Sequence, residues 1–119
     1  MNKTILIVDD EKDFCTVLSE SLSRDKYRVV TAFNGETALR LAKKENPDLM
    51  LLDIKMPGMD GIELLRRVRE IHRDLPIIIC TAYGEYKYDF GTWAGDAYLT
   101  KSADLTELKG KIRELLGDA

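Results

Sequence analysis

The strongest constraint on the fold is a set of four short apolar runs, each ending on a residue able to bind phosphate or metal. The runs lie at residues 5–8, 49–52, 77–80 and 98–100. In the same order, they lead into Asp9, Asp53, Thr81 and Lys101. In an open parallel α/β sheet, ligands bind in the crevice beyond the carboxyl ends of the strands. We therefore expect these four positions, although far apart in the chain, to meet at one edge of a sheet.

Strand-like and helix-like segments alternate along the whole chain, which favours βαβ units and a parallel sheet. We expect strands at residues 4–9, 28–32, 48–52, 76–80 and 96–100. Right-handed crossovers would then place two helices on one face of the sheet and three on the other. The sequence thus predicts a single α/β domain over residues 1–119, with a five-stranded parallel sheet and helices on both faces.

The helices are predicted from apolar stripes and capping residues. The first stripe consists of Phe14, Val17, Leu18 and Leu22. Helix N-caps are expected at Asn34, Asp60 and Asp104. Between Thr81 and Lys101 the pattern is weaker, because Gly91 interrupts it at a cost of ~1 kcal/mol relative to alanine. The fourth helix of the series is therefore expected to be short or irregular.

Composition and charge argue against several classes of protein. The chain carries 18 Lys and Arg against 21 Asp and Glu, a formal net charge of −3, whereas nucleic-acid-binding surfaces normally show a basic face. No apolar run approaches the roughly 20 residues of a membrane helix. The N-terminus leads directly into a strand, without the apolar segment of a signal peptide. We therefore expect a cytoplasmic protein that binds neither nucleic acid nor membrane. Cys15 and Cys80 lack a paired spacing and are expected to be small buried hydrophobes.

The carboxylates at two of the strand ends indicate a metal site. Asp9 and Asp10 follow the first strand, and Asp53 follows the third. Carboxylates held close together repel one another and recruit a cation, and hard oxygen ligands on a half-open site suit Mg²⁺. A simpler interpretation is that Asp10 and Glu11 only stabilise a helix N-terminus through its dipole. Asp53 at the neighbouring strand end favours the metal site.

Phosphoryl transfer onto Asp53 would use all of these groups. A carboxylate can act as a nucleophile toward phosphorus when its surroundings neutralise the incoming oxygens. Lys101 could supply a fixed positive charge and Thr81 a hydroxyl donor. Taken alone, a threonine in a strand and a surface lysine are ordinary, but their joint placement at strand ends favours the functional interpretation. Phosphate-binding and dinucleotide glycine motifs are both missing, which disfavours a nucleotide substrate.

These motifs resemble those of the receiver domain of two-component response regulators. The matching segments are residues 5–11, 51–61, 81–84 and 98–101, and the resemblance extends over essentially the whole chain. It implies the flavodoxin-like receiver fold with strand order 2-1-3-4-5. It also implies a stand-alone phosphoacceptor signalling module of a two-component or phosphorelay system. Such a module catalyses only its own phosphorylation and dephosphorylation, and is not an enzyme acting on a separate substrate.

The resemblance implies a role for each matching residue. The phosphoryl group would be bound by the phosphoacceptor Asp53, together with Thr81 and Lys101. The cofactor Mg²⁺ would be bound by Asp10, Asp53, the backbone carbonyl of Lys55 and, through water, Asp9. Thr81 and Tyr98 would form the conformational switch, and Lys55 and Tyr83 would tune the lifetime of the phosphoryl group.

The implied partners are proteins. The phosphoryl donor would be a phosphohistidine on a sensor histidine kinase or a histidine phosphotransfer protein, and the phosphorylated module would control a downstream protein. The aromatic residues Tyr86, Phe90 and Trp93 are interpreted either as local packing or as a partner surface, since aromatic residues are enriched at interfaces.

Two alternatives and two departures from the family pattern accompany this interpretation. A pseudo-receiver would bind partners independently of phosphorylation. A small-molecule phosphatase with an aspartate nucleophile would need a second aspartate two positions after Asp53, where Lys55 stands. One departure is Ser102, which follows Lys101 where the family usually has a proline in a cis peptide bond. The other is the stretch from Thr81 to Lys101, which is a little shorter than usual in the family and carries Gly91.

Overall fold

Five parallel strands form one sheet in the order β2-β1-β3-β4-β5. The computed structural model describes residues 2–53, 61–81, 96–101 and 104–117. The strands are β1 (Thr4–Val8), β2 (Arg28–Ala32), β3 (Leu49–Leu52), β4 (Ile77–Thr81) and β5 (Ala97–Thr100). The predicted sheet and its strand order are therefore confirmed, with each strand ending within one residue of its predicted position.

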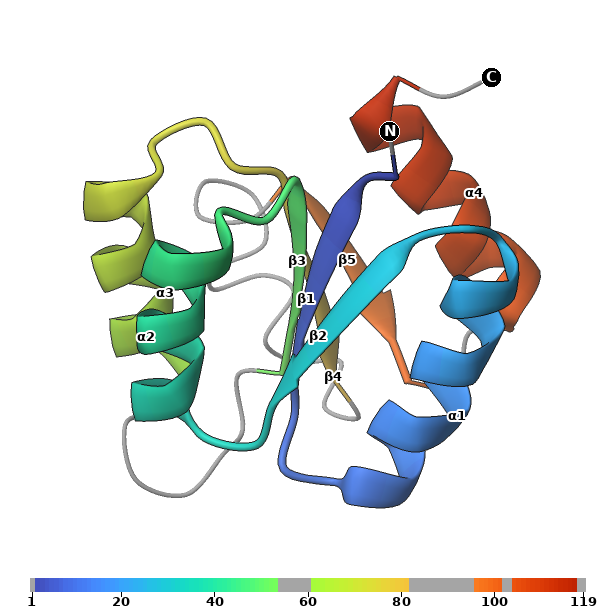
Figure 1. Ribbon diagram of the computed structural model, residues 1–119, viewed down its shortest axis with the longest axis horizontal. Helices are drawn as coiled ribbons and strands as arrows, with labels where there is room; N and C mark the ends of the chain where they lie inside the picture. The colour runs from blue at the N-terminus through green and yellow to red at the C-terminus, as the bar shows by residue number, and fades with distance from the viewer. Residues whose placement is uncertain (1, 54–60, 82–95, 102–103, 118–119) are drawn as a thin grey trace.

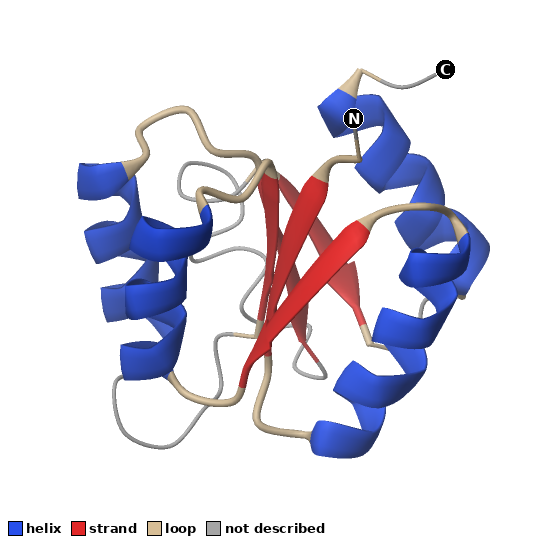
Figure 2. Cartoon of the chain, in the orientation of Figure 1, coloured by secondary structure: helices blue, strands red, loops and turns tan. Residues whose placement is uncertain are grey.

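Helices cover both faces of the sheet. Those that the structure describes are α1 (Lys12–Arg24), α2 (Gly35–Glu45), α3 (Gly61–Ile71) and α4 (Leu105–Leu116). Figures 1 and 2 show α2 and α3 together on one face, and α1 and α4 on the other. The segment expected to hold a short or irregular helix between β4 and β5 lies outside the described residues, so the prediction for it stays a prediction.

Two of the predicted helix caps are present in the structure. The side chain of Asn34 accepts a hydrogen bond from the backbone N–H of Thr37 at 2.8 Å, and begins α2. The side chain of Asp104 does the same with the backbone N–H of Glu107 at 2.9 Å, and begins α4. Both bonds satisfy an N–H group that the helix itself leaves without a partner. The third predicted cap, Asp60, lies outside the described residues.

The buried face of α1 differs from the predicted stripe at one position. Cys15, Leu18 and Leu22 are buried, but Val17 is 60% exposed. Successive helical residues turn by about 100°, so Val17 lies at least this far around the helix from each of the three buried residues. The prediction was wrong for Val17, because the spacing of apolar residues does not show where the centre of the buried stripe lies.

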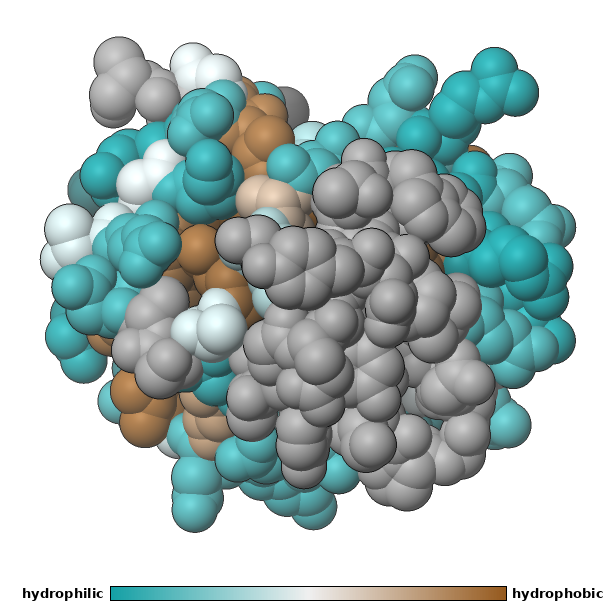
Figure 3. Space-filling view, turned by 180° about the vertical axis from the view of Figure 1, so that it is seen from behind, coloured by the Kyte–Doolittle hydropathy of each residue, from teal (hydrophilic) through white to brown (hydrophobic). Residues whose placement is uncertain are grey.

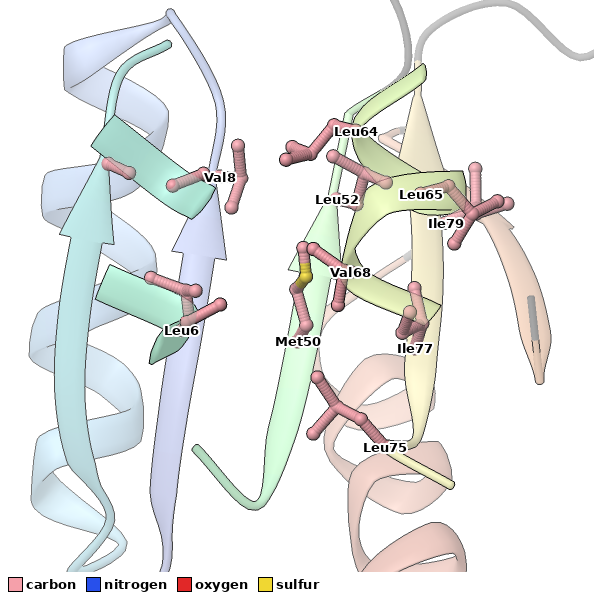
Figure 4. Close-up of a cluster of buried hydrophobic side chains, with 13 residues drawn as sticks. Leu6, Val8, Met50, Leu52, Leu64, Leu65, Val68, Leu75, Ile77 and Ile79 are labelled. Carbon is pink, nitrogen blue, oxygen red and sulfur yellow. The ribbon is translucent and has the colours of Figure 1, made fainter. Parts of the chain in front are cut away.

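The sheet is buried on both faces, as the continuously apolar β3 predicts. Alternate strand residues point to opposite faces. The side chains of Leu6, Met50 and Ile79 pack with Leu64 and Val68 of α3 in one cluster (Figure 4). On the opposite face the second cluster contains Ile5, Ile7, Leu51, Ile78, Leu18, Leu22, Leu108 and Ile112. Because both faces of the sheet are covered, the polar loops lie at the ends of the strands.

The surface carries both polar and apolar side chains. Seen from behind, hydrophilic side chains line both lateral margins of the molecule, and an apolar strip lies between the left margin and the grey residues (Figure 3). Among the described residues, none of the helices combines the length and apolar character needed to cross a membrane.

Candidate functional site

Three carboxylates meet at the carboxyl edge of the sheet. Asp9 and Asp10 follow β1 and Asp53 follows β3, two adjacent strands whose last residues, Val8 and Leu52, are paired in register. The carboxylate oxygens that these three residues could offer to a metal ion all lie within 4.8 Å of one another. Asp9 and Asp53 are buried, with 2% and 5% of their surface exposed, whereas Asp10 is exposed. The group is therefore open to solvent on one side.

Backbone and side-chain hydrogen bonds hold Asp9 in place. Its N–H donates to the carbonyl of Ala32 in β2 at 3.1 Å. Its Oδ1 accepts a hydrogen bond from the backbone N–H of Glu11 at 2.9 Å. The thiol of Cys15 lies 3.4 Å from its carbonyl oxygen, to which it donates. With one carboxylate oxygen bound in this turn, the other is directed into the site.

Lys101, which directly follows β5, places an ammonium group among these carboxylates. Its Nζ lies 2.8 Å from Oδ2 of Asp9 and 3.1 Å from Oδ2 of Asp53. It also contacts Oε1 of Glu11 and lies 5.0 Å from the centre of the Phe14 ring. Only 11% of the Lys101 side chain is exposed. Since β4 separates β3 from β5 in the sheet, the lysine reaches past the end of β4 to its partners.

The pKa values of Asp9 and Lys101 are both raised in this cluster, for different reasons. Burial raises the pKa of the Asp9 carboxyl, and the charge of Asp53 adds to this effect, although hydrogen bonds oppose it. Burial alone would lower the pKa of Lys101. Hydrogen bonds to Asp9, Glu11 and Asp53 outweigh burial and raise that pKa overall. The lysine is therefore a cation at neutral pH, and it faces more negative charge than it can neutralise.

In the absence of metal, replacing Asp9 with asparagine is expected to stabilise the protein at neutral pH, by an amount that shrinks as the pH falls. The native-state pKa of this carboxyl lies above its ordinary value of 3.8, so the native state binds the proton more tightly than the unfolded state does. Ionised Asp9 therefore costs stability at neutral pH, and this cost disappears as the pH falls through the raised pKa. Urea unfolding of both proteins in EDTA, from neutral to mildly acidic pH, measures the difference. A stability difference that does not change with pH would contradict this prediction.

The donor set fits a hard divalent cation. Carboxylate oxygens are the ligands that Mg²⁺ takes from proteins, and it usually keeps several waters. The two buried carboxylates, Asp9 and Asp53, provide oxygens in fixed positions. The exposed carboxylate of Asp10 lies on the side that is open to water. A phosphate group entering from that side would meet the cation, the Asp53 carboxylate and the Lys101 ammonium together.

The structure brings together four of the predicted site residues, namely Asp9, Asp10, Asp53 and Lys101. The backbone of Thr81 ends β4 and pairs in register with Thr100 of β5, which places residue 81 at the same edge of the sheet. Tyr98 lies half-buried in β5, against the cluster that α2 and α3 cover. The other predicted site residues lie outside the described residues: Lys55, Tyr83, Tyr86, Phe90 and Trp93. The peptide bond to Ser102 and the side chain of Thr81 also lie outside this description.

Sequence reasoning missed two contacts of Lys101, those with Glu11 and Phe14. The sequence indicates Glu11 only as an acid that favours the helix N-terminus, and Phe14 only as part of the buried stripe. No local pattern reveals a contact between residues 90 positions apart. The sequence does contain one weak signal for the Glu11 contact. Glu11 occupies a helix N-cap position, where Ser, Thr, Asp and Asn are preferred, so a glutamate there indicates a role other than capping.

Comparison with known proteins gives a consistent result for sequence and fold. Residues 5–113 match the family model described as the response regulator receiver domain. Sporulation initiation phosphotransferase F of Bacillus subtilis strain 168 is 39% identical over 118 residues, which cover 98% of this chain and 95% of that protein. The transcriptional regulatory protein PhoP, which governs alkaline phosphatase synthesis in the same bacterium, is 40% identical over 119 residues, and this chain spans 49% of its length.

Two solved structures connect the comparison to the site. The response regulator TrrA of Thermotoga maritima, in complex with Mg²⁺-BeF, is 43% identical with a TM-score of 0.89, and the match covers 95% of this chain and 98% of that one. TrrA in complex with the histidine kinase ThkA is 44% identical with a TM-score of 0.87, covering 96% and 98% of the two chains.

Proposed function

Because this chain belongs to the family of response regulator receiver domains, the phosphoacceptor signalling modules of two-component systems, we propose that it accepts its phosphoryl group on Asp53. Receiver domains are signalling modules and not classical enzymes. The observation that carries the assignment is the meeting of Asp9, Asp10 and Asp53 within 4.8 Å, with the Lys101 ammonium bound to the two buried carboxylates. We propose that one receiver domain extends over residues 1–119.

The proposed reaction uses the groups at this edge of the sheet. A carboxylate oxygen of Asp53 attacks the phosphorus of a phosphohistidine, the P–N bond breaks, and its electron pair stays with the departing imidazole. Mg²⁺ would be held by Asp10, Asp53, the carbonyl of Lys55 and, through water, Asp9, and when bound it would offset the charge of the phosphoryl oxygens. Lys101 lies 3.1 Å from Asp53 Oδ2, close enough to pair with an oxygen of the group that Asp53 receives. The hydroxyl of Thr81 donates a hydrogen bond to another oxygen of that phosphoryl group.

We propose that the donor is a sensor histidine kinase or a histidine phosphotransfer protein. The complex of TrrA with the kinase ThkA supports this partner class. The phosphorylated domain then controls a downstream protein, with Thr81 and Tyr98 as the switch. The half-buried position of Tyr98 in β5 supports that role, since a ring between core and surface can turn inward.

We further propose roles for five residues outside the described part of the chain, and a location for the protein. Lys55 and Tyr83 tune the phosphoryl lifetime, and the aromatic residues Tyr86, Phe90 and Trp93 form a partner surface.

The protein works in the cytoplasm, without direct contact to nucleic acid or membrane. Its cysteines Cys15 and Cys80 are free and buried, which supports this location because free thiols are typical of reducing compartments.

Intact mass after incubation with acetyl phosphate tests the proposed function. We expect the mass of one added phosphoryl group in the presence of Mg²⁺ and none after EDTA treatment. Asp53→Asn is expected to show no adduct, because it removes the nucleophile. Asp13→Asn, an exposed acid in the first turn of α1, serves as the matched control and is expected to keep the adduct. An adduct on Asp53→Asn would overturn the assignment, and no adduct on the folded wild-type protein with any donor would favour a pseudo-receiver.

A further inference from the structure

Glu11 contacts the Lys101 ammonium without belonging to the group of three carboxylates that could hold a metal ion. Its side chain is 61% exposed, whereas those of Asp9 and Asp53 are 2% and 5% exposed. Lys101 thus has two kinds of partner, buried carboxylates inside the site and an exposed carboxylate at its rim.

The local structure of α1 does not account for the Glu11 side chain. Glu11 is the N-cap residue of α1, but its side chain makes no capping hydrogen bond. Its backbone is held at both ends, since its N–H donates to Asp9 Oδ1 at 2.9 Å and its carbonyl accepts from the Cys15 N–H at 3.1 Å. The side chain is directed instead to a lysine 90 positions away. A role in the site explains this arrangement better than helix capping does.

Lys101 and a metal ion would compete for the same oxygens. The lysine is bound to Asp9 and Asp53 at 2.8 and 3.1 Å, and both residues belong to the metal-ligand group. A cation bound by Asp53 directly and by Asp9 through water would weaken the bonds of Lys101 to these oxygens and would also repel the ammonium. The remaining partners of the lysine then come from the start of α1: the Glu11 carboxylate, and the ring of Phe14 at 5.0 Å.

We propose that Glu11 is a positioning residue for Lys101, which holds the ammonium at the rim of the site when Mg²⁺ is bound by Asp53 and, through water, by Asp9. Once the metal weakens the bonds of Lys101 to Asp9 and Asp53, the lysine depends more on Glu11, so this ion pair is stronger in the metal-bound state than in the metal-free state. Glu11 thereby makes metal binding more favourable and keeps the ammonium within reach of an incoming phosphoryl group. This inference rests on the proposed function for the identity of the metal. The contact between Glu11 and Lys101 is present in the metal-free chain.

A double-mutant cycle on Mg²⁺ affinity, measured by isothermal titration calorimetry, tests the proposal. Glu11→Gln is expected to weaken binding by about three- to fivefold, the upper part of the range for one exposed ion pair. Lys101→Met is expected to tighten binding, because it removes the competitor. In the Lys101→Met background, Glu11→Gln is expected to change the affinity by less than about 1.5-fold.

A matched control separates positioning from a general effect of charge. Asp13→Asn removes the same charge from an exposed residue of the same helix end, and is expected to weaken Mg²⁺ binding less than Glu11→Gln does. The proposal would be overturned if both variants weakened binding equally. It would also be overturned if Glu11→Gln had the same effect with and without Lys101, which would make Glu11 a direct or water-mediated metal ligand.

A second measurement in EDTA is independent of both metal and phosphoryl chemistry. In protein labelled with ¹⁵N-lysine, an ammonium held by three carboxylates exchanges its protons slowly with water. Glu11→Gln is expected to speed this exchange for Lys101 by about threefold or more, whereas Asp13→Asn leaves it unchanged. Unchanged exchange in Glu11→Gln would overturn the proposal even if Lys101→Met failed to fold. Failure of wild-type protein to accept phosphate would contradict only the proposed function.

Discussion

Replacing Lys101 with methionine is expected to lower the free energy of unfolding of the metal-free protein by about 3 kcal/mol at neutral pH. Lys101 supplies positive charge to Asp9 and Asp53, which are 2% and 5% exposed. Without it, two buried carboxylates repel each other with no ammonium between them, and removing one partner of a buried pair costs more than the pair itself is worth. Urea unfolding in EDTA measures the loss.

Lys109→Met provides the matched control for this prediction. Lys109 pairs with Asp25 at 2.9 Å near the surface, with 23% and 38% of the two side chains exposed, so its loss is expected to cost less than about 1 kcal/mol. Saturating Mg²⁺ is expected to reduce the cost of Lys101→Met, because the metal ion replaces the missing positive charge between the carboxylates. Equal losses in the two variants, or a loss in Lys101→Met that Mg²⁺ does not change, would contradict the arrangement described for the site.

The second large effect is expected on the buried face of α1. Leu18 is 1% exposed and packs in the cluster between the sheet, α1 and α4. Leu18→Ala is therefore expected to cost about 3 kcal/mol, from lost burial and from the cavity left behind. Its neighbour Val17 is 60% exposed, and Val17→Ala is expected to change stability by no more than about 0.5 kcal/mol.

Urea unfolding of both α1 variants beside the wild-type protein checks this contrast. The two substitutions remove apolar atoms from adjacent positions of one helix. Differences in helix propensity are therefore too small to explain a large difference in their free energies of unfolding. Similar losses for the two variants would support the stripe expected from the sequence, which contains both residues. A larger loss for Val17→Ala would show that α1 is rotated about its axis relative to the described packing.

The sequence by itself determined the architecture and the ends of the strands. Apolar runs, helical stripes and caps such as Asn34 and Asp104 are local patterns, and each segment follows its own pattern within one turn or one strand. Parallel strands joined by right-handed crossovers then place the residues after each run at one edge of the sheet. The sequence therefore predicts Asp9, Asp53 and Lys101 as neighbours.

Only the tertiary structure decided which groups touch and how deeply they are buried. The contact of Lys101 with Glu11 joins residues 90 positions apart, and no spacing rule covers such a distance. Burial raises the pKa of Asp9, and burial is a property of everything packed around a group. The same holds for Val17 and Leu18, where a rotation of about 100° between neighbours decides which one enters the core. Local patterns depend on a few successive residues, whereas contact and burial depend on segments that meet only when the chain folds.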